Sequence, residues 1–304
     1  MADSQVPLAP TVPYDPQKAR ACATLVELAY ATFSKNPGVS NPPPPVFPDG
    51  WKFVVNLQLD LQLLGTLYFI GWVLTRDLGN GRSENAIVFL GTEDLEWLYD
   101  LDGTCTSHPL GGAVERGMYD MYCSITAIVP GQAPSPPPVR LTQYLTQMNM
   151  VIALTITGHS LGGALTTLTA ASIRMLPSPP SQQNMQIYSL ASPRIGNGDF
   201  ANAFDAVVPN NYRIYNIRDY VPTLPPAQWG FQHVLTALPQ PELDSWQYPI
   251  YHGLNPIKAA ECYHSHAGYL YMLSELADVD PGSKELGTCF APNVASRSVQ
   301  LTHV

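Results

Sequence analysis

The sequence predicts an α/β fold in which a mostly parallel central sheet is covered by helices on both faces. One observation is the alternation of short β-branched, apolar runs with stretches at helical spacing. Another is the segment 151–175, where a strand-like apolar run turns at glycines into an Ala- and Leu-rich stretch. The 304 residues are 45% hydrophobic and show no internal repeat. We expect one domain over 1–304, with an extended lead-in at about 1–15 and a tail at about 291–304.

One helix and three strands are expected before this segment. Apolar residues recur every three or four positions over Pro16–Phe33, which predicts an amphipathic helix. Aromatic and branched residues predict strands over Trp51–Asp60, Thr66–Thr75 and Asn85–Leu90. A turn rich in Gly and Asn separates the last two strands, so they are expected to form a hairpin within the sheet.

Three further elements flank or follow the segment. A helix is expected over Val139–Met148, and strands over Met185–Leu190 and Tyr212–Ile217, each ending in a loop that contains a proline. In a parallel sheet of this kind, functional residues gather at the carboxyl ends of the strands. The loops after the predicted strands are therefore where chemistry is expected.

The charge of the chain excludes two classes of partner. Charged residues make up only 13% of the sequence and the net charge is −9, without a basic cluster. Nucleic acid and an anionic membrane surface are therefore not expected partners, because both are bound through Lys and Arg. No charged residue occurs between Arg140 and Arg174, but glycines interrupt this run, so no transmembrane segment is expected.

Five cysteines do not indicate a metal site. They are odd in number and show no C-x-x-C spacing, and their pairing cannot be deduced from the sequence: Cys22, Cys105, Cys123, Cys262 and Cys289. The first residues lack the basic start and apolar core of a signal peptide. As written, the sequence fits a cytoplasmic protein, or a secreted one from which a leader has been removed.

The turn within 151–175 reads Gly158-His159-Ser160-Leu161-Gly162. Between a strand and a helix, Gly-x-Ser-x-Gly is typical of a nucleophile elbow, in which the serine occupies a cramped backbone conformation at the tip of the turn. A serine hydroxyl becomes a good nucleophile only when a histidine takes its proton and a carboxylate orients that histidine. Ser160 is therefore the candidate nucleophile.

The partners of Ser160 should follow it in the order acid, then histidine. Asp219 lies directly beyond a predicted strand and is the best-placed acid. Four other acids are less closely tied to a strand end: Asp199, Asp205, Glu242 and Asp244. Five histidines fit the base less well by order or context: His108, His159, His233, His252 and His303. His264 and His266 remain, and their spacing alone does not separate them.

Over about residues 15–290 the chain resembles the class 3 lipase family of α/β hydrolases. Four blocks carry the resemblance in the right order: Ile87–Thr92, Gly158–Gly163, Ser192–Asn197 and Asp219–Pro222. The resemblance implies an α/β-hydrolase fold and hydrolysis of esters through an acyl-enzyme, without a metal or other cofactor. It also implies an acylglycerol or another neutral ester as substrate. Alternatives are a feruloyl-type esterase, a phospholipase, or a non-catalytic binding protein of the same fold.

The family pattern also assigns roles to residues. It implies Ser160 as nucleophile, Asp219 as acid and His266 as base, because the family histidine precedes x-x-aromatic-Leu and His266 fits that spacing. It implies an oxyanion hole formed by the backbone N–H groups of Thr92 and Leu161.

The acidic segment after Thr92 is interpreted as a mobile helical lid. Four apolar residues would cover the acyl pocket: Leu95, Trp97, Leu98 and Leu101. Such a helix would turn its apolar side outward during transient contact with a lipid–water interface. A fixed surface helix is the alternative.

Overall fold

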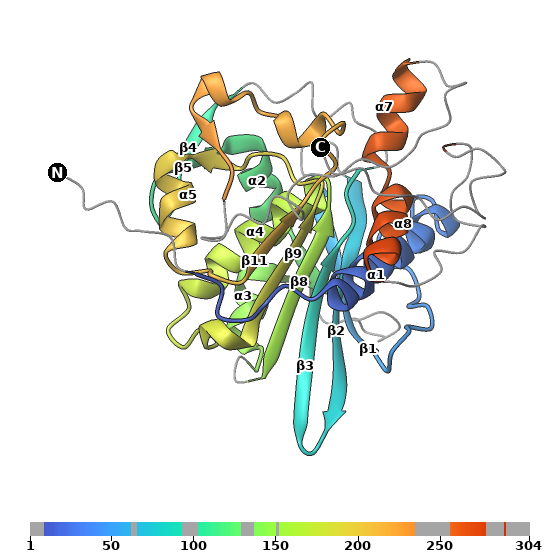
Figure 1. Ribbon diagram of the computed structural model, residues 1–304. Coiled ribbons are helices and arrows are strands. Elements are labelled where there is room, and N and C mark those ends of the chain that lie inside the picture. The colour runs from blue at the N-terminus through green and yellow to red at the C-terminus, as the bar shows by residue number, and fades with distance from the viewer. Residues whose placement is uncertain are drawn as a thin grey trace.

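The computed structural model describes residues 9–61, 66–92, 103–128, 137–149, 152–234, 256–277 and 289. These residues form a central sheet with helices on both faces, which confirms the predicted α/β-hydrolase fold (Figure 1). The predicted lid, at residues 93–101, lies outside the described residues.

Eight strands form the central sheet: β1 (Lys52–Leu61), β2 (Thr66–Gly79), β3 (Arg82–Phe89), β6 (Thr126–Ile128), β7 (Val139–Arg140), β8 (Ala153–His159), β9 (Met185–Leu190) and β11 (Asn211–Ile214). Their order across the sheet is β11-β9-β8-β3-β2-β1-β6-β7. Strands β3, β8, β9 and β11 run parallel, while β1, β2, β6 and β7 pair antiparallel on one side of β3. The parallel part carries the segment 151–175.

The predicted hairpin is confirmed as β2 and β3. Its turn holds Asn80 and Gly81, both with positive φ (53° and 70°). Two consecutive residues with positive φ match the right-handed twist of the strands, and Asn and Gly tolerate that conformation best. The hairpin continues β2 beyond its predicted end, as far as Gly79.

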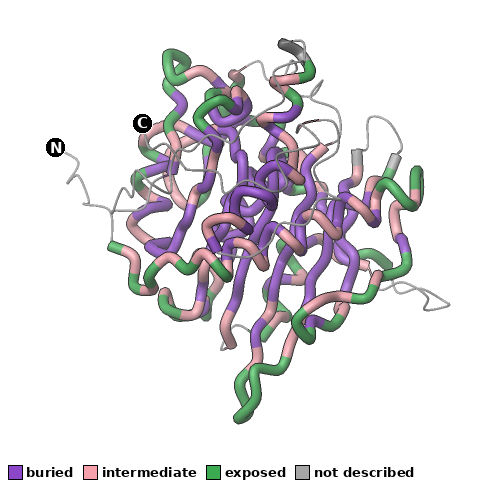
Figure 2. The backbone as a smooth tube through the Cα atoms, turned by 45° about the vertical axis from the view of Figure 1, so that its right-hand side comes forward, coloured by how far each residue is buried: buried purple, intermediate pink, exposed green. Residues whose placement is uncertain are grey.

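Seven α-helices are described: α1 (Pro16–Lys35), α2 (Arg116–Ser124), α3 (Leu141–Gln147), α4 (Leu161–Arg174), α5 (Gly198–Asp205), α7 (Pro256–His264) and α8 (His266–Leu276). Helix α1 packs on α8, β3 and β8, whereas α4 packs on β8 and β9 together with α2 and α3. The sheet therefore lies between two helical layers, and Figure 2 shows its strands buried at the centre. None of the described helices is both long and apolar enough to cross a bilayer.

Helix α1 begins where the sequence predicts. The Asp15 side chain accepts a hydrogen bond from the Gln17 N–H at 2.9 Å, and Pro16 occupies the first helical position. Its apolar face is buried in the core, from Ala19 through Val26 to Tyr30. This burial brings the C-terminal half of α1 against the sheet beside the end of β8.

A second, smaller sheet was not predicted. Its strands are β4 (Cys105–Ser107), β5 (Ala113–Glu115), β10 (Gly196–Asn197) and β12 (Phe231–Gln232), in the order β12-β10-β5-β4. Strands of two or three residues are too short for a hydrophobic period to reveal. Asn197 joins two elements there, because its side-chain oxygen accepts hydrogen bonds from the N–H groups of Ala113 and Phe200, both at 3.0 Å.

A buried carboxylate joins three elements near the start of β3. Glu84 Oε1 accepts hydrogen bonds from Lys18 at 2.9 Å and Thr155 at 2.6 Å, and Oε2 accepts from Arg76 at 2.6 Å. Burial by itself would raise the pKa of Glu84, but Lys18, Thr155 and Arg76 outweigh it and hold the pKa below its ordinary value of 4.5. The charged form is therefore the one that the folded chain stabilises.

We expect Glu84→Gln to lower the free energy of unfolding at neutral pH by about 3 kcal/mol, because two partly buried cations, Lys18 and Arg76, lose the buried carboxylate that pairs with them. The folded pKa of Glu84 lies below its unfolded value, so this stabilisation is present above the unfolded pKa. It is lost as pH falls through the folded pKa. Urea unfolding of both proteins at neutral pH and at about pH 3.5 should therefore show a smaller difference at the lower pH.

The control is Glu261→Gln, which removes an ion pair with Lys258 at 2.8 Å between side chains that are about half exposed. It should cost less than about 0.5 kcal/mol. Equal losses in the two variants would contradict a structural role for the buried cluster.

Candidate active site

The turn between β8 and α4 is a nucleophile elbow. Ser160 has φ 59° and ψ −125°, a conformation that L-residues rarely adopt. The flanking glycines are required by space: a Cβ on Gly158 would lie 2.3 Å from the Gly162 carbonyl oxygen, and one on Gly162 would lie 2.6 Å from that of Leu90. Ser160 stands at the tip of the turn but is fully buried.

Ser160 contacts a histidine and, through it, a carboxylate. His264 Nε2 lies 2.8 Å from Ser160 Oγ, and His264 Nδ1 lies 2.8 Å from Asp219 Oδ2. The carboxylate can only accept, so Nδ1 carries the proton and Nε2 is free to accept the serine proton. This is the arrangement in which a neutral imidazole activates a hydroxyl.

The base predicted from the family pattern, His266, is wrong in this geometry. Its Nδ1 pairs with Glu27 on α1, and its ring stacks on Tyr30 with 3.9 Å between centroids. His264 ends α7, Ser265 is the N-cap of α8, and His266 is the first residue of that helix. The change of direction at Ser265 sends His264 toward Ser160 and His266 toward α1.

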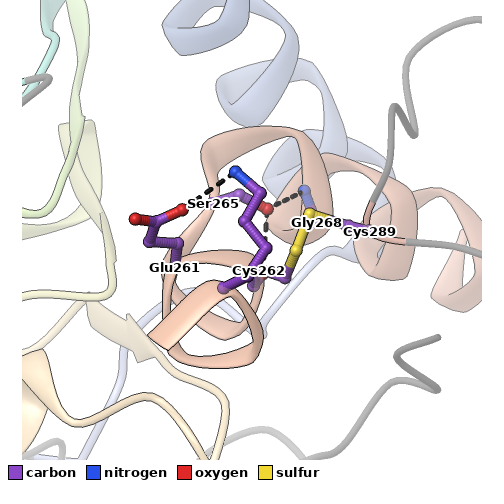
Figure 3. The surroundings of a disulfide bond; sticks show 6 residues. Glu261, Cys262, Ser265, Gly268 and Cys289 are labelled. Atoms are coloured by element: carbon purple, nitrogen blue, oxygen red, sulfur yellow. Dashed lines mark hydrogen bonds and ion pairs between the residues drawn. A yellow bond between two sulfur atoms is a disulfide. The ribbon is translucent and has the colours of Figure 1, made fainter. Parts of the chain in front are cut away.

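The cap at Ser265 marks the break in the chain between the two histidines. Its hydroxyl accepts a hydrogen bond from the Gly268 N–H at 3.1 Å and donates to the Cys262 carbonyl at 2.9 Å (Figure 3). Serine just before a run of helix formers is a common N-cap.

Asp219 is held in place by three groups besides His264. Its backbone N–H donates to the Asn216 carbonyl at 2.9 Å, and its Oδ1 accepts from the Val221 N–H at 3.0 Å. The Tyr269 hydroxyl donates to Asp219 Oδ2 at 2.8 Å, a contact that the sequence did not predict. As predicted, Asp219 follows the last parallel strand, β11, and it is buried.

Comparison with known proteins finds a family for part of the chain. Residues 86–229 match the family model described as lipase (class 3). Over these residues, just under half of the chain, the sequence is similar to the class 3 lipase family. A lipase from Rhizomucor miehei is 31% identical over 179 residues, which is 57% of this chain and 47% of that protein. Phospholipase A1-Igamma3, chloroplastic, from Arabidopsis thaliana is 26% identical over 229 residues, 64% of this chain and 42% of that protein.

Solved structures show the same fold. The refined triacylglyceride lipase of Rhizomucor miehei aligns with a TM-score of 0.51 and 25% identity, covering 71% of this chain and 77% of that one. The sequence matches span less than half the length of the two curated relatives named above. The Ser160 elbow and Asp219 lie within residues 86–229, which the family model matches.

The backbone at Gly91 and Thr92, where the oxyanion hole is predicted, lies against Ser160. A Cβ on Gly91 would lie 2.8 Å from Ser160 Cβ and 2.7 Å from the His159 carbonyl oxygen. Thr92 follows directly, and within the described part of the chain its buried hydroxyl oxygen has no hydrogen-bond partner. Leu161 is the first residue of α4, so its N–H belongs to the positive end of that helix.

Three other histidines have structural contacts. His159 Nδ1 lies 3.0 Å from the Tyr30 hydroxyl. His233 Nε2 donates to the Pro222 carbonyl at 2.7 Å. His108 is buried, and burial lowers its pKa to about 4. The remaining two, His252 and His303, lie outside the described residues.

The other acids that the sequence left open do not reach the site. Asp199 and Asp205 lie on α5, and Asp219 alone of the described candidates contacts His264. Glu242 and Asp244 lie outside the described residues.

One disulfide lies next to the base. Cys262, two residues before His264, forms a disulfide with Cys289, and this bond lies beside the start of α8 (Figure 3). The sequence did not predict this pairing, and the other three cysteines form no disulfide. The bond ties the end of α7, which carries His264, to a residue well beyond α8, and so restricts the part of the chain that carries the base.

Proposed function

We propose that this protein is a serine carboxylic ester hydrolase that cleaves acylglycerols or other neutral esters through an acyl-enzyme. The observation that carries the proposal is the hydrogen-bonded series Ser160, His264, Asp219 at 2.8 Å for each contact. An oriented neutral histidine beside a serine on a strained elbow is the arrangement that acyl transfer requires. Both catalytic hydrogen bonds are buried, so water does not compete for them.

The first half of the reaction forms the acyl-enzyme. Ser160 Oγ attacks the ester carbonyl carbon while His264 Nε2 takes the hydroxyl proton. The carbonyl oxygen becomes negative and accepts hydrogen bonds from the N–H groups of Thr92 and Leu161. Each donor of this kind is worth about 3 to 4 kcal/mol in the transition state. When the intermediate collapses, the bond to the alcohol oxygen breaks, and the alcohol leaves with the proton from His264.

The second half releases the acid. A water gives its proton to His264 and attacks the acyl carbon, and the Ser160 oxygen leaves with that proton. In both halves the His264 ring is positive at the transition state, and the Asp219 carboxylate stabilises that charge. Tyr269 and the Val221 N–H keep the carboxylate oriented by their hydrogen bonds to its two oxygens.

The substrate class is supported by relatives and by charge. One relative is named a triacylglyceride lipase and another a phospholipase A1. The net charge of −9, without a basic cluster in the sequence, favours neutral esters over anionic lipids. Ester hydrolysis with a phospholipid or a feruloyl ester as substrate remains an alternative for the same site. The predicted lid would affect access to it and stays a prediction.

A fluorophosphonate probe should label one serine, Ser160, in the folded protein, because only a serine activated by His264 attacks the phosphorus. Peptide mapping by mass spectrometry locates the adduct. Protein unfolded in urea is the control and should remain unlabelled. A non-catalytic binding protein of the same fold would also remain unlabelled when folded, and that result would sink the proposal.

The same preparation then separates the substrate classes. Initial rates on tributyrin, phosphatidylcholine and methyl ferulate should be highest on tributyrin. A labelled protein that prefers phosphatidylcholine or methyl ferulate would retain the mechanism and change the substrate.

A further inference from the structure

Tyr30 reaches from α1 to the back of the site. Its hydroxyl oxygen lies 2.9 Å from the Gly91 nitrogen and 3.0 Å from His159 Nδ1. Gly91 immediately precedes Thr92, and His159 immediately precedes Ser160. One side chain on the first helix therefore contacts the backbone of Gly91 and the side chain of His159, which are the neighbours of Thr92 and Ser160 in the sequence.

The direction of these hydrogen bonds is set by their partners. The Gly91 N–H can only donate, so the Tyr30 oxygen accepts from it. The phenol proton is then available to His159 Nδ1, which accepts it only as a neutral ring. Burial, followed by the neighbouring His264 and His266, holds the pKa of His159 well below its ordinary value, in agreement with a neutral ring.

The Tyr30 ring is itself held in place. His266 stacks on it with 3.9 Å between centroids and an interplanar angle of 11°. His266 Nδ1 in turn pairs with Glu27, which precedes Tyr30 by three residues on α1. Residues three apart lie on the same helix face, so α1 presents both partners to α8. The His266–Glu27 pair thus fixes the position of the ring between two helices.

The backbone at Gly91 and Thr92 depends on the hydrogen bond from the Gly91 N–H to Tyr30. Gly91 has no Cβ, and a Cβ would lie only 2.6 Å from the Tyr30 oxygen, so the two groups are in close contact. Glycine adopts many backbone conformations at little cost. A hydrogen bond to its N–H limits the orientation of the peptide that leads to Thr92, and therefore of the Thr92 N–H.

We propose that Tyr30 is a positioning residue for the oxyanion corner, which is the backbone of Gly91 and Thr92, and that the His266–Glu27 pair holds the Tyr30 ring in place. The proposal rests on the proposed ester hydrolysis, because the corner matters only if an oxyanion forms there. It gives His266 the role of holding Tyr30 in place, whereas the family pattern predicted that His266 is the base. The effect should appear in the transition state and not in substrate binding, because Tyr30 touches the corner from behind.

The test is Tyr30→Phe, which retains the stacked ring and removes only the hydroxyl. We expect kcat for p-nitrophenyl butyrate to fall by about tenfold, the rate equivalent of one hydrogen bond, with KM changed less than about twofold. The matched control is Tyr212→Phe, which removes a hydroxyl that donates to the Val12 carbonyl in another part of the core. The control should lower thermal stability without lowering kcat.

The role of the His266–Glu27 pair in holding Tyr30 is tested by a double-mutant cycle. His266→Ala alone should lower kcat by about three- to tenfold, and its effect should be much smaller in the Tyr30→Phe background, because the hydroxyl it positions is already gone. Additive losses of kcat in the double variant would overturn the role of His266 in positioning Tyr30. Should Tyr30→Phe fail to fold, His266→Ala with unchanged KM and lowered kcat supports the proposal, and unchanged kcat overturns it.

The proposal and the function beneath it fail differently. A wild-type protein that neither labels nor hydrolyses esters disproves the ester hydrolase, whatever Tyr30 does. A wild-type protein that hydrolyses p-nitrophenyl butyrate, with kcat of Tyr30→Phe within about twofold of it, overturns the positioning role alone.

Discussion

Replacing Ser160 with alanine is expected to lower kcat for p-nitrophenyl butyrate by at least about ten-thousandfold, because no other group can form the acyl-enzyme. The fold should be retained. Ser160 is buried, but its side chain contributes a single hydrogen bond, to His264, and alanine occupies the same space. Stopped assays on purified protein, with circular dichroism and a melting curve, measure both properties. Retention of more than about one per cent of the wild-type kcat would exclude Ser160 as nucleophile.

The strained backbone at the elbow supplies a second control for the same variant. Ser160→Gly should be equally inactive but more stable than Ser160→Ala, since glycine adopts φ 59° without the steric penalty of a Cβ. The gain should be about 1 kcal/mol. A lower melting temperature for the glycine variant would show that the turn stores no strain.

Replacing His264 with alanine should be as damaging as replacing Ser160, at least about ten-thousandfold in kcat, and the double variant should lose no more than either one alone. The reason is that the two groups act as a unit across a 2.8 Å hydrogen bond. His266→Ala should cost about tenfold at most, because its ring lies on Tyr30 and its Nδ1 faces Glu27. Steady-state rates on one soluble ester measure all four proteins.

The outcome that contradicts this assignment is also clear. If His266→Ala were the inactive variant and His264→Ala retained most of its activity, then His266, and not His264, would face Ser160. The positioning role of the His266–Glu27 pair would then be lost as well, whereas the roles of Ser160 and Asp219 would stand.

Much of the fold was predictable because its signals are local. The hairpin of β2 and β3 follows from a turn that needs two residues of positive φ, and α1 begins where Asp15 and Pro16 form a cap. The small sheet of β4, β5, β10 and β12 was not predictable, since its strands are too short to show a period. The antiparallel pairing of β1 with β6 likewise depends on contacts between residues far apart in sequence.

The sequence by itself determined the candidate nucleophile and the candidate acid. Ser160 stands where a β-branched run meets a helix and where glycines alone fit on both sides, and Asp219 stands directly beyond a strand. Each of these assignments needs only the residues around it, because a strand end and a tight turn are defined within a few residues. The family pattern therefore agrees with the geometry at both positions.

Only the tertiary structure decided the base and its surroundings. His264 and His266 differ by two positions in the sequence, and their roles depend on how α8 lies against α1 after the break at Ser265. Tyr30 reaches Gly91 across 61 residues, and Tyr269 reaches Asp219 across 50. Contacts at such separations leave no trace in local spacing, because they arise from the packing of whole helices on the sheet.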